Sequence, residues 1–186
     1  MKKTVLLVIL DGWGLGRKGD SNPIYVANPP NLKWLGENFP LTSLQAAGIS
    51  VGLPWGEVGN SEVGHLTLGA GKVIYQYFPR ITLAVKDGSF FNNSALRAAF
   101  DHAQKNNSSV NLIGLLTDGN IHSSIEHLKA LLKMAENEGV SRLKLHLFAD
   151  GKDSPPGSIG KFLNDVPQEK LGSLIGRYYA MDREEN

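Results

Sequence analysis

The sequence predicts an α/β fold built on a parallel sheet. Two mainly apolar stretches, residues 110–116 and 143–149, have the length and the branched side chains of buried strands. Between them, residues 123–138 repeat apolar side chains at helical spacing. A strand, a helix and a second strand in that order form a βαβ unit, which places the two strands parallel in one sheet.

The first 75 residues begin with another apolar run, Val5 to Leu10, which predicts a strand buried on both faces. This run is too short to cross a bilayer, and no small-residue cleavage site follows it, so it does not fit a signal peptide. Further along we expect a helix over residues 30–37, a strand over 42–46 and a helix over 61–68.

From about residue 76 the pattern becomes more regular. We expect helices over residues 81–85 and 93–105, ahead of the first strand of the βαβ unit. In the helix between the strands, Ser123 and Glu126 predict a capping box, and Gly139 predicts the stop.

Composition restricts the class of protein. The chain has 186 residues, which allows one domain, or one domain and part of another. A formal net charge of +1 argues against a nucleic-acid binder, which would be basic on one face. There is no cysteine, so disulfides and thiolate chemistry are excluded and a reducing compartment is the simplest expectation.

Two stretches resemble nucleotide-binding motifs and fail on inspection. The glycine-rich stretch after Asp11 needs a glycine where Arg17 stands, so it is not a dinucleotide-binding loop. The Gly71-Lys72 pair ends like a P-loop, but Leu66 replaces the first glycine and Val73 replaces the hydroxyl residue.

Asp11 and Ser61 are the first candidate site residues. Asp11 follows a predicted parallel strand, where α/β sheets bind ligands, and a carboxylate there suits Mg²⁺ or Mn²⁺; equally, it opens a turn with Gly12. Ser61 is either a helix N-cap or a nucleophile placed at the positive end of a helix. No histidine is placed as its base, since His65 lies one helical turn away, so a metal is the better activator.

A second set of polar residues follows the strands of the βαβ unit. His122 lies after the first strand, and Lys152 and Asp153 lie after the second, so the three could converge at one sheet edge. A cation beside a carboxylate and an imidazole suits phosphate binding and proton transfer, although a polar turn ended by two prolines explains the second stretch equally well. Arg177 and Arg183 either clamp an anion or face solvent.

Taken together, these stretches resemble the N-terminal part of the cofactor-independent (2,3-bisphosphoglycerate-independent) phosphoglycerate mutases. The resemblance covers nearly the whole chain and depends on five motifs in one order. They are LDGWGL, GNSEVGHLTLGAGKVIYQ, TDGNIHSSIEHL, DGKDSPP and GRYYAMDR.

The resemblance implies a fold and an activity. An alkaline-phosphatase-like metal domain, here residues 1–75, would be interrupted by an inserted α/β transferase domain, beginning here with residues 76–186. Such enzymes interconvert 3-phosphoglycerate and 2-phosphoglycerate in glycolysis and gluconeogenesis through a phosphoserine. They use two divalent ions, usually Mn²⁺ and in some members Mg²⁺ or Co²⁺, and no nucleotide or bisphosphoglycerate cofactor.

The resemblance also implies roles for individual residues. Ser61 would be the nucleophile, and Asp11 with Ser61 would bind metal. Asp153 would be the acid and base toward the glycerate hydroxyls. The positions that match substrate contacts are His122, Lys152, Asp153, Arg177 and Arg183.

Two departures from the family pattern matter. The family reads DGRDTPP where this chain reads DGKDSPP, so Lys152 keeps the charge but loses the planar fork of arginine. The family's other metal ligands come from a C-terminal half that has no counterpart here. We therefore expect the chain to be the first part of a longer protein and to be inactive alone.

Other expectations follow from the same resemblance. The complete enzyme would be cytoplasmic and monomeric, would act on a small phosphorylated acid, and would bind neither nucleic acid nor membrane. Two alternatives stay open: a related metal-dependent phosphomonoester hydrolase, and a non-catalytic fragment that binds phosphorylated acids or a partner.

Overall fold

A computed structural model describes residues 3–181 of the chain. The chain divides into two compact units, residues 1–74 (unit 1) and 75–186 (unit 2). This division falls one residue from the expected boundary, while the assignment of the units to a metal domain and a transferase domain stays a prediction. Across residues 3–181, no helix combines the length and the apolar character needed to span a bilayer.

Unit 2 is built on a three-stranded parallel sheet. The strands are β1 (Val110–Leu116), β2 (Leu143–Ala149) and β3 (Leu171–Gly176), in the order β1-β2-β3. The predicted strands 110–116 and 143–149 are confirmed residue for residue, as is their parallel pairing. The third strand was not predicted. At the end of the sheet Leu116 pairs with Ala149, which pairs with Gly176.

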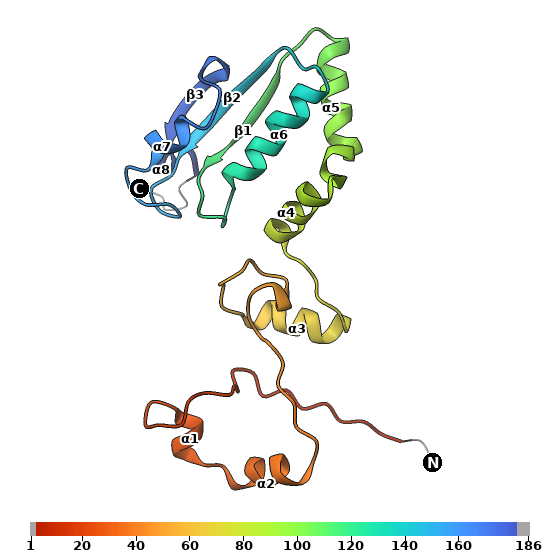
Figure 1. Cartoon of the computed structure of the whole chain (residues 1–186), viewed down its shortest axis with the longest axis vertical. Helices are drawn as coiled ribbons and strands as arrows, with labels where there is room; N and C mark the ends of the chain where they lie inside the picture. Colours follow the sequence, from red (N-terminus) through yellow and green to blue (C-terminus); the bar gives the residue numbers. More distant parts are fainter. Residues whose placement is uncertain (1–2, 182–186) are drawn as a thin grey trace. The chain divides into compact units, whose positions relative to one another are not determined.

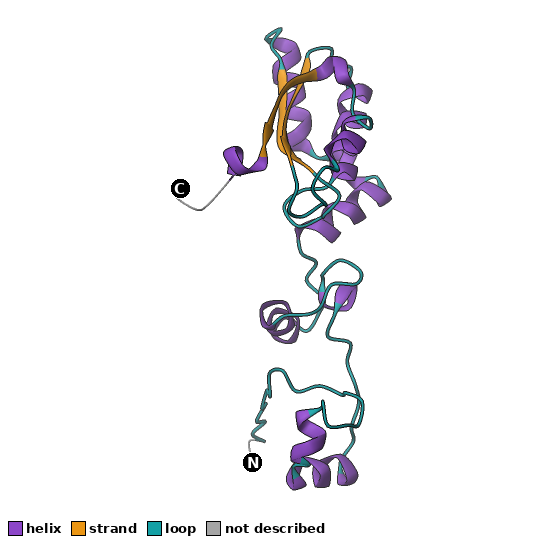
Figure 2. Ribbon diagram, turned by 90° about the vertical axis from the view of Figure 1, so that its left-hand side faces the viewer, coloured by secondary structure: helices purple, strands orange, loops and turns teal. Residues whose placement is uncertain are grey.

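Helices cover one face of this sheet, and only the short helix beside the described C-terminal end lies on the other side (Figure 2). Apolar side chains of the helices pack against Leu145 and Leu147 of the central strand, and this core includes Phe100, Met134 and Phe162. The helices of unit 2 that Figure 1 labels are α4 (Tyr77–Asp87), α5 (Ser94–Lys105), α6 (Ile125–Asn137), α7 (Ile159–Leu163) and α8 (Arg177–Met181).

The predicted helices of unit 2 exist, but one predicted cap is wrong. Helix α6 begins at Ile125 with Ser124 as its N-cap residue, and the Ser124 side chain makes no capping hydrogen bond. The chain enters this helix through a backbone bond from Ile125 to the carbonyl of Thr117, so the expected Ser123–Glu126 box does not form. Gly139 follows the helix with a φ of 71°, as the predicted stop requires.

The other face of the sheet is more open. His146 in β2 contacts Ser173 Oγ of β3 through Nδ1 at 2.9 Å and Asn111 Oδ1 of β1 through Nε2 at 3.2 Å. These bonds tie the three strands together through side chains. Beside them, Ile113 is 68% exposed.

Unit 1 holds short helices joined by long irregular segments. They are α1 (Pro23–Ala27), α2 (Pro30–Asn38) and α3 (Ser61–Ala70), so the predicted helices at 30–37 and 61–68 are confirmed. A small buried cluster of Val51, Leu53 and Val63 packs α3 against a 3-10 turn at Gly48–Val51.

The predicted strands of unit 1 are wrong. Residues 5–10 form no strand and are exposed, from 90% at Val5 to 44% at Ile9, and residues 42–46 form no strand either. A strand needs a neighbour that completes its hydrogen bonds, and the described part of unit 1 contains none. The apolar run therefore has the composition of a buried strand without the partner that would bury it.

Candidate functional site

The end of the sheet in unit 2 is organised by a residue that the sequence did not single out, Asp150. It directly follows β2, and its side chain is 1% exposed. Its carboxylate accepts hydrogen bonds on both oxygens. Oδ2 accepts from Thr117 Oγ1 (2.6 Å), Ser154 N (2.8 Å) and Ser154 Oγ (3.0 Å), and Oδ1 accepts from Arg177 Nη1 (3.0 Å), Lys152 N (3.1 Å) and Asp153 N (3.3 Å).

These bonds determine the charge state of Asp150. Burial alone would raise the pKa of this carboxyl, but the bonds from Thr117, the following backbone amides and Arg177 hold its pKa far below the usual range. The pKa of Arg177 is raised by its hydrogen bond to Asp150 and by its close contact with the Asp153 carboxylate. Both groups are therefore ionised at neutral pH.

Asp153 and Arg177, two of the predicted substrate-binding residues, are brought together here. Arg177 Nη1 lies 2.8 Å from Asp153 Oδ2 in an ion pair whose angles fall short of a hydrogen bond. The Asp153 side chain is 7% exposed and that of Arg177 is 16% exposed. A buried carboxylate beside a fixed guanidinium is an arrangement suited to binding an anionic ligand and exchanging a proton with it.

The loop that follows β1 packs tightly against this pair. Thr117 Oγ1 also accepts a bond from the Gly119 amide at 3.0 Å. A Cβ at Gly119 would lie 2.5 Å from the Asp153 carbonyl oxygen and 2.6 Å from its Cβ. Only glycine allows the two loops to approach this closely, so Gly119 is part of what places Asp153.

The side chains of two other members of the predicted set, His122 and Lys152, do not join the cluster. His122 and Lys152 are exposed, and neither side chain makes a hydrogen bond or ion pair with another described residue of the set. The expected convergence of His122, Lys152 and Asp153 is therefore not seen as direct contacts. Arg183 lies outside the described residues.

In unit 1, Ser61 and Asp11 meet across 50 positions of sequence. Ser61 Oγ donates a hydrogen bond of 2.6 Å to Asp11 Oδ2, and both residues are exposed. Asp11 opens a turn with Gly12, whose φ is 81°, closed by a bond from Trp13 N to Leu10 O. The expected turn is thus present, and it presents the carboxylate to the serine.

Ser61 is not the N-cap of α3, as one interpretation of the sequence held. Asn60 is the cap, and its side chain accepts from the Val63 amide at 3.1 Å. Because Asn60 caps the helix, the Ser61 hydroxyl is left to bond with Asp11. His65 bonds through Nδ1 to the Ser61 carbonyl oxygen at 2.7 Å and so is not a base for the hydroxyl.

The Asp11–Ser61 pair has the donor chemistry of half a divalent metal site. Carboxylate and hydroxyl oxygens are ligands for Mg²⁺ and Mn²⁺, and these two lie close enough to share one ion. Within residues 3–181, no group of three or more acidic, histidine or cysteine side chains is gathered as a complete metal site. The pair therefore fits a metal but needs further ligands.

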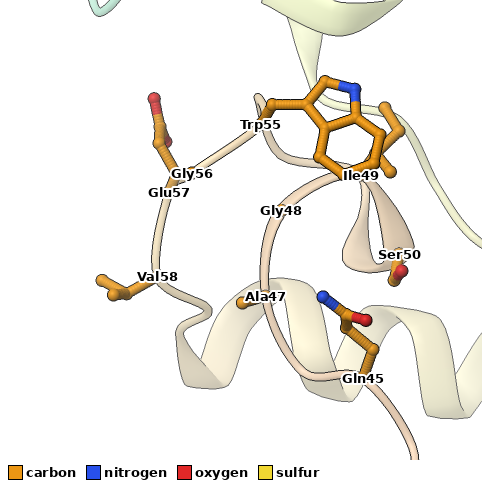
Figure 3. A pocket seen from close by; sticks show the side chains of 9 residues that line it. All are labelled: Gln45, Ala47, Gly48, Ile49, Ser50, Trp55, Gly56, Glu57 and Val58. Atoms are coloured by element: carbon orange, nitrogen blue, oxygen red, sulfur yellow. The ribbon is translucent and has the colours of Figure 1, made fainter.

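A cavity of about 190 Å³ lies in unit 1, between residues 45 and 58 (Figure 3). Glu57 is the one charged residue among those that line it, and neither Ser61 nor Asp11 is among them. A cavity whose charge is negative does not attract a phosphorylated acid, so we do not place the site there. The lining residues are Gln45, Ala47, Gly48, Ile49, Ser50, Trp55, Gly56, Glu57 and Val58.

Comparison with known proteins gives one consistent result. Two curated relatives are 2,3-bisphosphoglycerate-independent phosphoglycerate mutases, from Clostridium tetani (48% identical) and Clostridium beijerinckii (47% identical). Each alignment covers 98% of this chain, and the chain spans 37% of the length of each relative.

A solved structure agrees with these relatives. It is a Leishmania mexicana phosphoglycerate mutase crystallised at low cobalt concentration, with a TM-score of 0.55 and 31% identity over 94% of this chain and 34% of that one. A family model described as the N-terminus of BPG-independent phosphoglycerate mutase (PGAM) matches residues 81–186, more than half of the chain. The chain therefore belongs to the BPG-independent phosphoglycerate mutase N-terminus family.

Proposed function

We propose that this chain is the N-terminal part of an enzyme that interconverts 3-phosphoglycerate and 2-phosphoglycerate, in glycolysis and gluconeogenesis, through a phosphoserine at Ser61. The observation that carries the proposal is the 2.6 Å bond between Ser61 Oγ and Asp11. It pairs the matched nucleophile with the matched metal ligand, although 50 residues separate them. A serine that served only the helix would not need this partner, since Asn60 already caps it.

The phosphoryl transfer to the serine belongs to unit 1, which we assign to the alkaline-phosphatase-like metal domain. Ser61 Oγ attacks the substrate phosphorus, so that an Oγ–P bond forms as the ester bond of the substrate breaks. Asp11 and Ser61 would hold divalent metal, Mn²⁺ in the first place and otherwise Mg²⁺ or Co²⁺, which when bound favours ionisation of the serine hydroxyl. The first-turn amides of helix α3 that the Asn60 side chain does not occupy would face a phosphoryl group carried on the first residue of the helix.

The proton transfers and the binding of the glycerate belong to unit 2, which we assign to the inserted transferase domain. Asp153 donates a proton to the glycerate oxygen that loses the phosphoryl group and accepts the proton of the hydroxyl that receives it. Arg177 holds an anionic group of the substrate, and His122, Lys152 and Arg183 complete the binding set. Because the phosphoserine stores the phosphoryl group between the two transfers, no bisphosphoglycerate cofactor is needed.

A chimera tests this proposal. The part of the Clostridium tetani enzyme that aligns with this chain would be replaced by this chain, and mutase activity measured with an enolase-coupled assay and added Mn²⁺. We expect activity from the chimera, none from its Ser61→Ala variant, and strong loss in its Asp11→Asn variant. A folded chimera that is inactive, or one that keeps its activity without the Ser61 hydroxyl, refutes the proposal.

The same experiment separates the alternatives. A phosphomonoester hydrolase would release inorganic phosphate from 3-phosphoglycerate without forming 2-phosphoglycerate, and a non-catalytic fragment would do neither. The 186-residue chain alone is expected to be inactive, because Asp11 and Ser61 are too few ligands for two ions. We also place the complete enzyme in the cytoplasm, as a monomer.

A further inference from the structure

We propose that Asp150 is a positioning residue for the substrate site: it aligns the Arg177 guanidinium so that the free edge of that group can receive an anionic group of the substrate. This inference deepens the proposed function and rests on it for the identity of the ligand. Asp150 itself does not touch the substrate in this account, because its side chain is 1% exposed and both of its oxygens already accept hydrogen bonds.

The first argument is where Asp150 sits. Leu116, Ala149 and Gly176 are the paired last residues of the three strands. Thr117, Asp150 and Arg177 each come one position later, and Asp150 bonds to both of the others. One carboxylate therefore joins the carboxyl ends of all three strands, at the edge where parallel sheets bind their ligands.

The second argument is that the two carboxylate oxygens of Asp150 accept hydrogen bonds from different groups. Oδ2 is bonded by Thr117 and Ser154, which fasten the carboxylate to the scaffold. Oδ1 is bonded by Arg177 Nη1 and by the amides of Lys152 and Asp153. Oδ2 therefore anchors the carboxylate to the loops around it, and Oδ1 holds Arg177 and the backbone of Lys152 and Asp153. Because the carboxylate is rigid and planar, fixing Oδ2 also fixes the position of Oδ1.

The third argument is that Arg177 still has N–H donors that can bind a ligand. Nη1 is shared between Asp150 and Asp153, at 3.0 Å and 2.8 Å. Its Nη2 and Nε have no hydrogen-bond partner within the described residues. A guanidinium binds a carboxylate or phosphate best through two parallel N–H groups, so its value as a ligand depends on its plane being fixed beforehand. Asp150 and Asp153 fix that plane from one side and leave the other donors to an anion.

Asp150→Asn tests the inference in the 186-residue chain. The side chain keeps its shape but loses the negative charge that pairs with the Arg177 guanidinium in either orientation of the amide, and its NH₂ cannot accept a hydrogen bond on the side that it faces. The matched control is Ser154→Ala, which removes a hydroxyl bond to Oδ2 and leaves Oδ1 intact. NMR relaxation and hydrogen exchange of the Arg177 Nε–H group report how firmly the guanidinium is held.

We expect the Arg177 Nε–H group to be ordered in the wild-type chain and in Ser154→Ala, and mobile in Asp150→Asn. An Arg177 that stays ordered in Asp150→Asn, or that is equally mobile in the control, overturns the inference. If Asp150→Asn does not fold, Asp150→Glu takes its place, because the longer side chain keeps the charge and displaces the carboxylate, with the same expected mobility.

A titration with 3-phosphoglycerate adds a readout that a merely structural role would not move. Loss of a charged hydrogen bond is expected to raise the dissociation constant roughly tenfold to hundredfold in Asp150→Asn. In an Arg177→Lys background the same substitution should have little further effect, since the planar fork that Asp150 aligns is gone. Equal effects in both backgrounds overturn the inference. Two results together would separate the inference from the proposed function. If the wild-type chain binds no 3-phosphoglycerate but Arg177 becomes mobile in Asp150→Asn, the proposed function is contradicted and the positioning role of Asp150 is supported.

Discussion

Replacing Gly119 with alanine should destabilise unit 2 through one defined clash. The new Cβ would lie 2.5 Å from the Asp153 carbonyl oxygen, 2.6 Å from Asp153 Cβ and 2.7 Å from its carbonyl carbon. Two of these three atoms are backbone and the third is a Cβ, so none can move away by a simple side-chain rotation. The loop after β2 must shift instead.

Forcing extra volume into a packed site costs about 1–3 kcal/mol. In a domain of roughly 100 residues each kcal/mol lowers the melting temperature by about 4–8 °C, so a fall of at least about 4 °C is expected. The matched control is Gly114→Ala in β1, where a Cβ meets no atom within 4 Å. That variant should be neutral or more stable by up to about 1 kcal/mol, because alanine narrows the unfolded ensemble.

Circular dichroism is the appropriate probe of this unfolding. All three tryptophans, Trp13, Trp34 and Trp55, lie in unit 1, so their fluorescence would not report on unit 2. A Gly119→Ala variant that melts within about 1 °C of the Gly114→Ala variant would show that the two loops do not approach as described, and would remove the support for Gly119 as a determinant of Asp153.

Three further predictions concern other residues. Burial lowers the pKa of His127, so as the pH falls below about 6.5 the unfolded chain binds a proton at this residue before the folded chain does. The free energy of unfolding, measured by urea titration, should therefore decrease as the pH falls from about 6.5 through the lowered pKa of the folded chain. A decrease of equal size in the His127→Gln variant would contradict this. Gly59→Ala would place a Cβ against the carbonyl oxygen of Ala46 and should weaken the start of α3. Gly64→Ala lies within α3, where a Cβ meets no other atom, and should increase the helix content measured by circular dichroism. A higher helix content in Gly59→Ala than in Gly64→Ala would contradict the close approach of Gly59 to Ala46. Lys152→Arg in the active chimera should lower KM for 3-phosphoglycerate, because arginine restores a planar fork, and an unchanged or higher KM in the steady-state assay would show that this position does not bind substrate.

The strands that the sequence predicted correctly are those whose pattern is sufficient by itself. Residues 110–116 and 143–149 are mainly apolar stretches flanked by polar residues, and a helix between them supplies the crossover. Strand β3 escaped notice because Gly172 and Ser173 interrupt its apolar character. The run at 5–10 failed for the opposite reason: its composition is right, but strand formation depends on a partner elsewhere in the fold.

The sequence could predict site residues that belong to a recognisable motif, but not those whose role depends on contacts between distant segments. The NSEVGH stretch pointed to Ser61, and the structure adds the bond to Asp11 that no local pattern shows. Asp150 was passed over because its importance arises from three strand ends meeting, which are far apart in sequence. A usable signal did exist, since Thr117 and Asp150 both directly follow predicted strands, but Arg177 follows the strand that was missed.

The Asp150 carboxylate, which joins the ends of the three strands, also stabilises one register of the sheet over others. Parallel neighbours can slide past one another by two residues and still satisfy their backbone bonds, with the same side chains facing the core. If β3 were displaced in this way, Arg177 would leave Asp150, and a nearly inaccessible negative charge would lose its counterion. Removing one partner of a buried ion pair costs roughly 3–5 kcal/mol, a large share of the stability of a small domain. Sheets with a shifted β3 are thereby disfavoured during folding, so the buried Asp150 carboxylate also selects the correct register of the strands.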